Sequence, residues 1–266
     1  MPPPPPPGLA VVTGASAGIG AALTRQLSRA GRPVLAVARR EERLVALSRA
    51  VDAAGGAPIH PLAADVTDPE TASRIAARAA ELGGAAWLVN NAGFGYYGAF
   101  EKQERDRLAL LVRLNCEALI FLTHALLPQV RASGEGVILN VASAAAFQPT
   151  PFMSVYGASK AFVLSFSEGL AEELRDAGVF VGAYCPGPVE TEFGEVSGAP
   201  RGHFEAVPQV LSAEGAAREA LAQIERREVV FVPRALYRLA TSASRFLPRS
   251  VIRRLSARAH WPGEGT

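Results

Sequence analysis

The sequence predicts an α/β fold, in which a single domain is built on a doubly wound parallel sheet of about seven strands with helices on both faces. Short apolar runs alternate with stretches of helical spacing, which is typical of strand–helix–strand units and a parallel sheet. The first apolar run enters a glycine turn. The 266 residues, 49% hydrophobic and 20% charged, suffice for one large globular domain, and no internal repeat is visible.

The first ninety residues predict four strands and three helices. Buried strands are expected at 9–12, 33–38, 58–63 and 87–89, where apolar side chains follow one another. Helices are expected at 19–30, 41–54 and 69–82, and glycines follow the first two. Asp68 precedes Pro69 and is placed to cap the third helix.

The rest of the chain predicts three more strands and a helical tail. The expected elements are a helix at about 102–130, a strand at 137–141, a helix that holds Tyr156 and ends before Gly178, a strand at 179–184, a helix near 213–227 and a strand at 228–232. A Gly/Pro-rich loop occupies about 186–210. The predicted division is an arm at 1–7, a domain at 8–233 and an extension at 234–266.

Composition argues against several classes of function. A net charge of +2 speaks against nucleic-acid binding as a global property. Cys116 and Cys185 lack CxxC spacing, which predicts two free thiols in a reducing, cytoplasmic compartment. The four histidines are scattered, so no metal site is predicted, and no apolar run approaches the ~20 residues of a membrane span. Prolines 2–7 predict a polyproline arm and do not form a signal peptide.

Tyr156 and Lys160 are the strongest candidate catalytic pair. They stand four residues apart, so a helix places both on one face. A fixed ammonium beside a phenol is expected to lower the phenol's pKa from roughly 10 and make it a proton donor near neutral pH. Lysine occurs only here and at Lys102, although the chain is rich in arginine, which cannot release its proton. Tyr and Lys four apart also occur on many solvated helices, so other motifs must decide.

Three glycines between the first strand and the first helix predict a dinucleotide site of the Rossmann type. Gly14 permits the tight turn, Gly18 lets the backbone approach a pyrophosphate, and Gly20 allows close helix packing. The helix N-terminus then offers free N–H groups to phosphate. An ordinary glycine-rich turn is the alternative, but its place between a strand and a helix favours the dinucleotide site.

Six motifs in order resemble the classical short-chain dehydrogenase/reductase family over residues 8 to 233. They are Thr13-Gly14-Ala15-Ser16-Ala17-Gly18-Ile19-Gly20, Asn90-Asn91-Ala92-Gly93, a helix asparagine at Asn115, Ser143 thirteen residues before Tyr156, the Tyr156–Lys160 pair, and Pro186-Gly187-Pro188-Val189-Glu190-Thr191. Six ordered motifs are far more specific than any one of them.

The resemblance implies a hydride-transferring oxidoreductase. Ser143 would bind the substrate oxygen, Tyr156 would exchange its proton, Lys160 would bind ribose hydroxyls and lower the Tyr156 pKa, and Asn115 would hold a water leading from Lys160 to solvent. The implied cofactor contacts are Gly14, Ser16, Ala17, Gly18, Ile19, Gly20, Arg39, Arg40, Asp65, Val66, Asn91, Ala92, Gly93, Tyr156, Lys160, Pro186, Gly187, Val189 and Thr191.

NADP(H) is favoured over NAD(H) as the cofactor. NAD-preferring sites place a carboxylate at the end of the second strand, whereas this chain has Arg39 and Arg40 there and no acid until Glu41. A guanidinium attracts a 2′-phosphate that an acid would repel. One departure from the NADP pattern is Ala17, where many NADP users carry a second cation.

The substrate is expected to be a small molecule with a carbonyl or alcohol group that carries bulky apolar substituents. The candidate pocket residues are Phe94, Tyr96, Tyr97, Phe147, Met153 and Phe193, with a substrate loop at about 188–212. Aromatic residues are more often simply core. The alternatives are a redox sensor that binds a dinucleotide without turnover, which would be expected to lose the Tyr or Lys, and an epimerase or dehydratase of the extended branch, for which the chain is short.

The tail is the chain's clearest basic feature. No Asp or Glu occurs from Val229 to Gly263, while arginines alternate with apolar residues at roughly helical spacing. Residues 234 to 260 therefore predict one or two amphipathic helices. Their partner could be an anionic membrane, the domain itself or a second subunit of a homo-oligomer, which we expect this protein to form.

Overall fold

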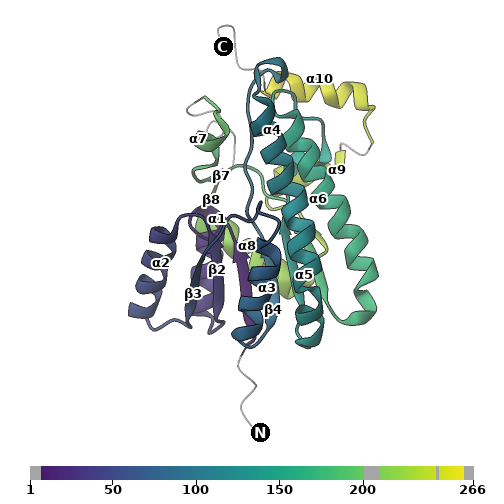
Figure 1. Cartoon of the computed structure of the whole chain (residues 1–266). Helices are drawn as coiled ribbons and strands as arrows, with labels where there is room; N and C mark the ends of the chain where they lie inside the picture. Colours follow the sequence, from purple (N-terminus) through teal and green to yellow (C-terminus); the bar gives the residue numbers. More distant parts are fainter. Residues whose placement is uncertain (1–6, 201–209, 244–245, 261–266) are drawn as a thin grey trace.

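A computed structural model describes residues 7–200, 210–243 and 246–260, and residues 1–6 of the predicted arm lie outside the described part. Seven parallel strands form one sheet in the order β3-β2-β1-β4-β5-β6-β9 (Figure 1). Their bounds are β1 Leu9–Thr13, β2 Val34–Ala38, β3 Ile59–Ala63, β4 Ala85–Asn90, β5 Val137–Val141, β6 Phe180–Tyr184 and β9 Val230–Phe231. The predicted α/β class and all seven strands are confirmed.

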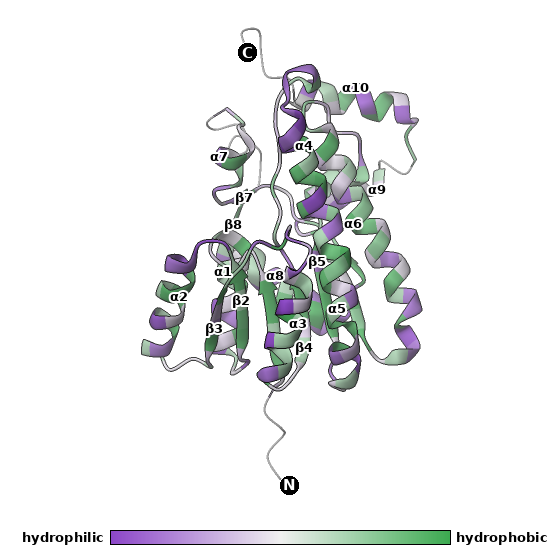
Figure 2. Ribbon diagram, viewed as in Figure 1, coloured by the Kyte–Doolittle hydropathy of each residue, from purple (hydrophilic) through white to green (hydrophobic). Residues whose placement is uncertain are grey.

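Helices cover both faces of this sheet. On one face lie α1 (Gly18–Arg29), α2 (Glu41–Ala53) and α8 (Ala213–Arg226), and on the other α3 (Thr71–Glu81), α5 (Ala118–Ala132) and α6 (Ser154–Glu173). Alternate side chains of β1 serve the two layers: Ala10 and Val12 join the first core cluster, and Leu9 and Val11 the second. The central strands β1 and β2 are accordingly almost entirely apolar, and Figure 2 shows them mostly green.

The start of α3 differs from the prediction. The helix begins at Thr71 rather than Pro69, and its N-terminal flanking residue Glu70 makes no capping bond with its side chain. Asp68 accepts the N–H of Glu70 with its carboxylate and the N–H of Thr71 with its carbonyl oxygen. The predicted cap is therefore wrong, because Asp68 holds the turn that precedes the helix.

The predicted helix at 102–130 is also divided. A 3₁₀ turn at Phe100–Lys102 precedes α4 (Arg105–Val112), and a π-helical turn at Arg113–Glu117 joins α4 to α5. Of the described helices, the stretch Arg105–Ala132 is the one long and apolar enough to cross a membrane by length and composition. Leu111, Leu122 and Leu126 in it are fully buried against the domain.

Three short elements rise above the carboxyl edge of the sheet. Strands β7 (Val189–Glu190) and β8 (Leu211–Ser212) pair in parallel, and α7 (Phe193–Ser197) follows β7 (Figure 1). They lie in the predicted substrate loop, of which residues 201–209 are outside the described part. No apolar run of strand length marks them, so the sequence did not predict them.

The tail forms two helices, α9 (Ala235–Ala243) and α10 (Arg249–His260), as predicted. Its inner side packs on the domain: Tyr237 lies against Gly187, and Ser256 Oγ donates a hydrogen bond of 2.6 Å to the Pro149 carbonyl. Its outer side leaves Leu239 and Leu255 more than half exposed. Figure 2 shows purple and green alternating along α10.

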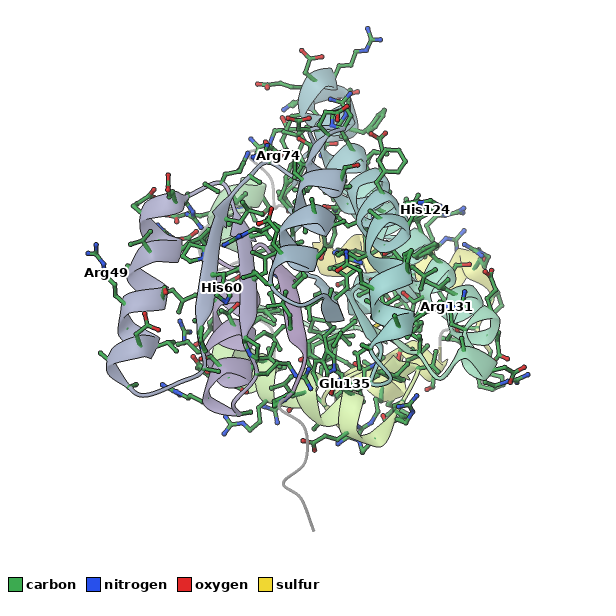
Figure 3. All side chains as sticks on the ribbon, turned by 60° about the horizontal axis from the view of Figure 1, so that its bottom comes forward. Arg49, His60, Arg74, His124, Arg131 and Glu135 are labelled. Atoms are coloured by element: carbon green, nitrogen blue, oxygen red, sulfur yellow. The ribbon has the colours of Figure 1, made fainter. Side chains whose placement is uncertain are left out.

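At the opposite edge of the sheet, Glu135 fixes the start of β1. Its carboxylate accepts the N–H of Gly8 and pairs with Arg32 at 2.9 Å (Figure 3). The Arg32 guanidinium lies 4.1 Å from the ring centroid of Trp87 on β4. This cluster stabilises the amino edge, which leaves the carboxyl edge for the candidate site.

Candidate active site

The glycine turn lies at the carboxyl end of β1. Gly14 and Gly18 have φ values of +66° and +52°, which favour glycine. A Cβ on Gly20 would collide with the Gly14 carbonyl oxygen and with Asn91 Nδ2, so only glycine lets α1 approach the turn so closely. Ile19 packs against the core beside it.

The N-terminus of α1 suits a phosphate. The flanking residue Ala17 makes no side-chain capping bond, and the first turn contains no acidic residue. The N–H groups of a 12-residue helix are thus directed at the turn without a competing side chain. The residues present therefore fit a dinucleotide's pyrophosphate.

Thr13 joins this turn to the end of β4. Its hydroxyl accepts the N–H groups of Asn91 and Ala92, each at 3.0 Å. The Asn91 side chain donates to the Thr13 carbonyl oxygen at 2.8 Å. Asn91 and Ala92, predicted as cofactor contacts, thus hold the loop after β4 against the glycine turn after β1.

Arg40 lies over the glycine turn but is already paired. Its guanidinium donates to Ser16 Oγ at 3.3 Å and to the Glu192 carboxylate at 2.8 Å. Arg43, one turn further along α2, donates to the other Glu192 oxygen at 2.5 Å. Hydrogen bonds from Arg43 and Arg40 lower the pKa of Glu192, so it is a carboxylate at neutral pH. The sequence prediction did not include Arg43 or Glu192.

Arg39 and Asp65 form the outer rim of this region. The Arg39 side chain is 72% exposed and lies 4.0 Å from an Asp65 oxygen. Asp65 also accepts the N–H and hydroxyl of Thr67. Burial alone would raise the Asp65 pKa, but these bonds and Arg39 lower it overall. Val66 packs against the second core cluster.

Ser143 and Tyr156 meet beyond the ends of β5 and β6. Ser143 follows β5, and its hydroxyl lies close enough to the Tyr156 phenol to lower the phenol's pKa. The Ser143 oxygen also accepts the N–H of Ala145 at 3.1 Å and caps the short 3₁₀ helix Ala144–Phe147. The carbonyl oxygen of Pro186 accepts the N–H of Ala144 at 2.8 Å, which fixes the serine loop against the Pro186–Gly187 segment.

The pKa of Tyr156 differs from the sequence expectation. Burial of the hydroxyl raises it to about 12, although Ser143 lowers it and the neighbouring Cys185 raises it further. Burial likewise lowers the pKa of Lys160 to about 8, with Cys116 and Cys185 acting in the opposite direction. The sequence prediction of a lowered Tyr156 pKa is therefore wrong, because the loss of water around the phenol is the largest effect.

Lys160 lies beneath Tyr156 on the same face of α6. Its Nζ is 5.8 Å from the Tyr156 ring centroid and donates to the Val141 carbonyl oxygen at 2.7 Å. The side chain is only 6% exposed. The predicted pair is thus brought together at the end of β5.

Asn115 occupies the π-helical turn and reaches the same region. It accepts the N–H of Phe94 at 3.1 Å and donates to the Phe94 carbonyl oxygen and to Ser159 Oγ, both at 3.0 Å. A Cβ on Gly93 would lie 3.0 Å from Asn115 Oδ1 and 3.5 Å from Lys160 Nζ. Gly93 therefore lets the asparagine approach the lysine, and Ser159 is a further residue that sequence reasoning missed.

Three consecutive residues at the start of α7 lie against the glycine turn, the two arginines and Tyr156. Thr191 lies on the glycine turn, where a Cβ on Gly18 would come within 2.9 Å of its methyl carbon. Glu192 holds Arg40 and Arg43. The Phe193 ring lies against Tyr156 with a centroid separation of 5.3 Å. Val189, just before them, packs on the first core cluster.

The predicted pocket aromatics separate into two groups. Phe193 and Met153 both approach Gly95, where a Cβ would meet their side chains at 2.6 and 2.7 Å, so they lie beside Tyr156. The others are placed elsewhere: Phe147 packs on the third core cluster, Tyr97 is buried near Phe152, and the rings of Phe94 and Tyr96 lie beneath the Arg107 guanidinium.

Within the described residues, no group of three or more His, Cys, Asp or Glu side chains is arranged to hold a metal ion. His60 lies on β3 and His124 on α5 (Figure 3). Cys116 and Cys185 are free thiols. Burial raises the pKa of both, so neither is an activated nucleophile.

Comparison with known proteins agrees with this geometry. A family model described as short chain dehydrogenase matches residues 8–201. A short chain dehydrogenase of Pseudocercospora fijiensis is 39% identical over 188 residues, which cover 70% of this chain and 60% of the relative. The match thus spans less than two thirds of that relative's length.

Two solved structures are similar over nearly the whole chain. A short-chain dehydrogenase from Sphingobium yanoikuyae in complex with NADPH has a TM-score of 0.80 and 34% identity, covering 90% of this chain and 94% of its own. A bulky-bulky ketone specific alcohol dehydrogenase from Comamonas testosteroni has a TM-score of 0.77 and 30% identity, covering 91% and 93%.

Proposed function

Because the chain belongs to the short-chain dehydrogenase/reductase family, we propose that it is an NADP(H)-dependent oxidoreductase acting on an apolar carbonyl or alcohol. The observation that carries the proposal is the placement of Ser143 and Lys160 around Tyr156, next to an uncapped helix that follows a glycine turn. When bound, the nicotinamide cofactor supplies or accepts the hydride.

The chain's own residues handle the proton. Ser143 orients the substrate oxygen, and Tyr156 donates its hydroxyl proton during reduction or accepts it during oxidation. Lys160 provides positive charge beneath the phenol and binds ribose hydroxyls. Asn115 connects Lys160 toward solvent through a water. These assignments agree with the gathering of all four side chains at the ends of β5 and α4.

An apolar, bulky substrate is supported by the surroundings of Tyr156. Phe193 and Met153 lie beside it, and the similar Comamonas protein is a ketone-specific alcohol dehydrogenase. A sensor without turnover does not require the serine–tyrosine contact, and an epimerase or dehydratase would use the same pair on a different substrate. Turnover with simple ketones separates these alternatives from the proposal.

The test is a screen of ketones, aldehydes and alcohols, followed by NADPH absorbance. Tyr156→Phe should reduce kcat by about 10²-fold or more while the affinity for NADPH, measured by calorimetry, stays unchanged. Tyr184→Phe is the matched control, because Tyr184 lies on β6 and its buried ring packs against Phe231 in the first core cluster. Near-normal turnover by Tyr156→Phe would refute the proposal.

NADP(H) is proposed because Arg39 and Arg40 follow β2 and no acidic side chain precedes Glu41. The Sphingobium relative was solved with NADPH. Titrating NADPH and NADH calorimetrically into wild type and Arg39→Asp tests this preference. Equal affinities in the wild type, or an unchanged preference in the variant, would contradict it.

We also propose a cytoplasmic location with peripheral contact between the tail and an anionic membrane. Exposed Leu239, Val251 and Leu255 stand among arginines on α9 and α10, and these helices contain no acidic residue. Homo-oligomer formation stays a prediction, for which the mass in solution is the measurement.

A further inference from the structure

The Glu192 carboxylate stands where a cofactor's charge would be recognised. Each of its oxygens accepts from a different guanidinium, Arg40 at 2.8 Å and Arg43 at 2.5 Å. Arg40 at the same time donates to Ser16 in the glycine turn. The three side chains are between 38% and 44% exposed, so solvent and ligands reach them.

Glu192 supplies the carboxylate that the end of β2 lacks. In sites that prefer NAD, an acid at the end of the second strand accepts from the ribose 2′-hydroxyl and repels a 2′-phosphate. Here that strand ends in Arg39 and Arg40, and the acid comes instead from the loop after β7. A carboxylate and a phosphate use the same donor fork of an arginine, so one displaces the other.

We propose that Glu192 is a specificity-determining residue that competes with the cofactor's 2′-phosphate for Arg40 and Arg43. NADP(H) must release this carboxylate before both arginines can bind the phosphate, whereas NAD(H) carries a neutral hydroxyl and leaves it in place. Glu192 thereby lowers the preference for NADP(H) that the arginines create. The inference rests on the proposed dinucleotide site, and it concerns how strongly that site prefers NADP(H) over NAD(H).

The neighbours of Glu192 hold the loop in place, so a change at Glu192 should affect only its contacts with Arg40 and Arg43. Thr191 and Phe193 contact the glycine turn and Tyr156, so the loop remains attached on both sides when the central carboxylate is altered. Glu195, three residues later on α7, is exposed and forms none of the ion pairs found among the described residues. It offers a matched control.

The experiment compares adenosine 2′,5′-bisphosphate with adenosine 5′-monophosphate, which differ only by the 2′-phosphate. Calorimetry on full-length wild type, Glu192→Gln and Glu195→Gln gives the affinities. Glu192→Gln should bind the bisphosphate about three- to tenfold more tightly and the monophosphate unchanged, because two partly exposed ion pairs no longer compete. Glu195→Gln should match the wild type with both ligands.

Adding Arg43→Gln to Glu192→Gln should remove the gain in affinity for adenosine 2′,5′-bisphosphate. An unchanged bisphosphate affinity in Glu192→Gln, or an equal gain for both ligands, would overturn the inference. The proposed NADP(H) preference is judged separately, from wild type alone. A wild type that binds NADPH and NADH equally, with a preference appearing only in Glu192→Gln, would refute that preference and support the role of Glu192.

Discussion

Lys160 Nζ donates a hydrogen bond of 2.7 Å to the carbonyl oxygen of Val141, which ties the middle of α6 to the end of β5. Val141 lies two residues before Ser143, so the bond places the ammonium next to the strand end that carries the serine. The Lys160 side chain is only 6% exposed, so its compact ammonium is enclosed by the fold. A wider cation would have to displace its surroundings.

Lys160→Arg should therefore lose turnover although it keeps the positive charge. The planar guanidinium does not match the single carbonyl acceptor, and a shift of the site by about 1 Å can cost about 10²-fold in kcat. Lys102→Arg is the control, because Lys102 is exposed on the 3₁₀ turn before α4. Steady-state kinetics on both variants decide, and similar kcat values would contradict a positional role for Lys160.

Activity should depend on pH in opposite ways for the two directions. Lys160, with a pKa of about 8, is charged below that pH and loses its charge above it, so carbonyl reduction should fall as pH rises through about 8. Alcohol oxidation needs ionised Tyr156, whose pKa is about 12, so its rate should rise by up to about tenfold per pH unit below pH 8 and less steeply above it, where Lys160 loses its charge. An oxidation rate that levels off below pH 8 would contradict the high pKa of Tyr156.

Two glycines on α6 should respond in opposite ways to alanine. A Cβ on Gly157 would collide with the Thr150 hydroxyl, so Gly157→Ala should lower the free energy of unfolding by about 1–3 kcal/mol. Gly169 is exposed with open space around it, and Gly169→Ala should raise that free energy by about 0.5–1 kcal/mol. Urea denaturation of the two variants provides the measurement. Equal changes in the free energy of unfolding would mean that the segment near Thr150 moves to make space for the methyl group.

The tail should bind anionic vesicles at low salt. Vesicles of phosphatidylglycerol and phosphatidylcholine should sediment the full chain, and Arg253→Glu/Arg254→Glu should abolish this. The control Arg49→Glu/Arg74→Glu makes the same change of net charge on α2 and α3, where Figure 3 labels both side chains. Failure of the wild type to sediment, or equal loss in both double variants, would refute a specific role for the tail.

The sheet could be predicted because each of its strands leaves a local signal. β1 and β2 are uninterrupted apolar runs, and the glycines after β1 mark the turn that follows. The pairing β7–β8 joins two strands of two residues each, too short for any periodic pattern. The π turn was missed for a related reason, since its apolar side chains still resemble those of a continuous α-helix.

The site could be located from motifs, but its electrostatics could not. The spacing of Tyr156 and Lys160 places them on one face, yet the sign of the Tyr156 pKa shift depends on how much water the fold removes. The contact of Glu192 with Arg43 joins residues 149 positions apart, and no local pattern encodes it.

The π turn at Arg113–Glu117 also makes the chain's length critical at this point. Deleting one residue there would restore regular α-helical hydrogen bonds and leave α4 and α5 nearly in their present register, because the wider π turn absorbs one extra residue. Leu111 would keep its buried position, but Asn115 would lose the wider turn that brings it to Phe94. Single-residue deletions should therefore be far more harmful here than substitutions of the exposed Arg113, and homologous chains of this architecture are expected to keep gaps out of the segment.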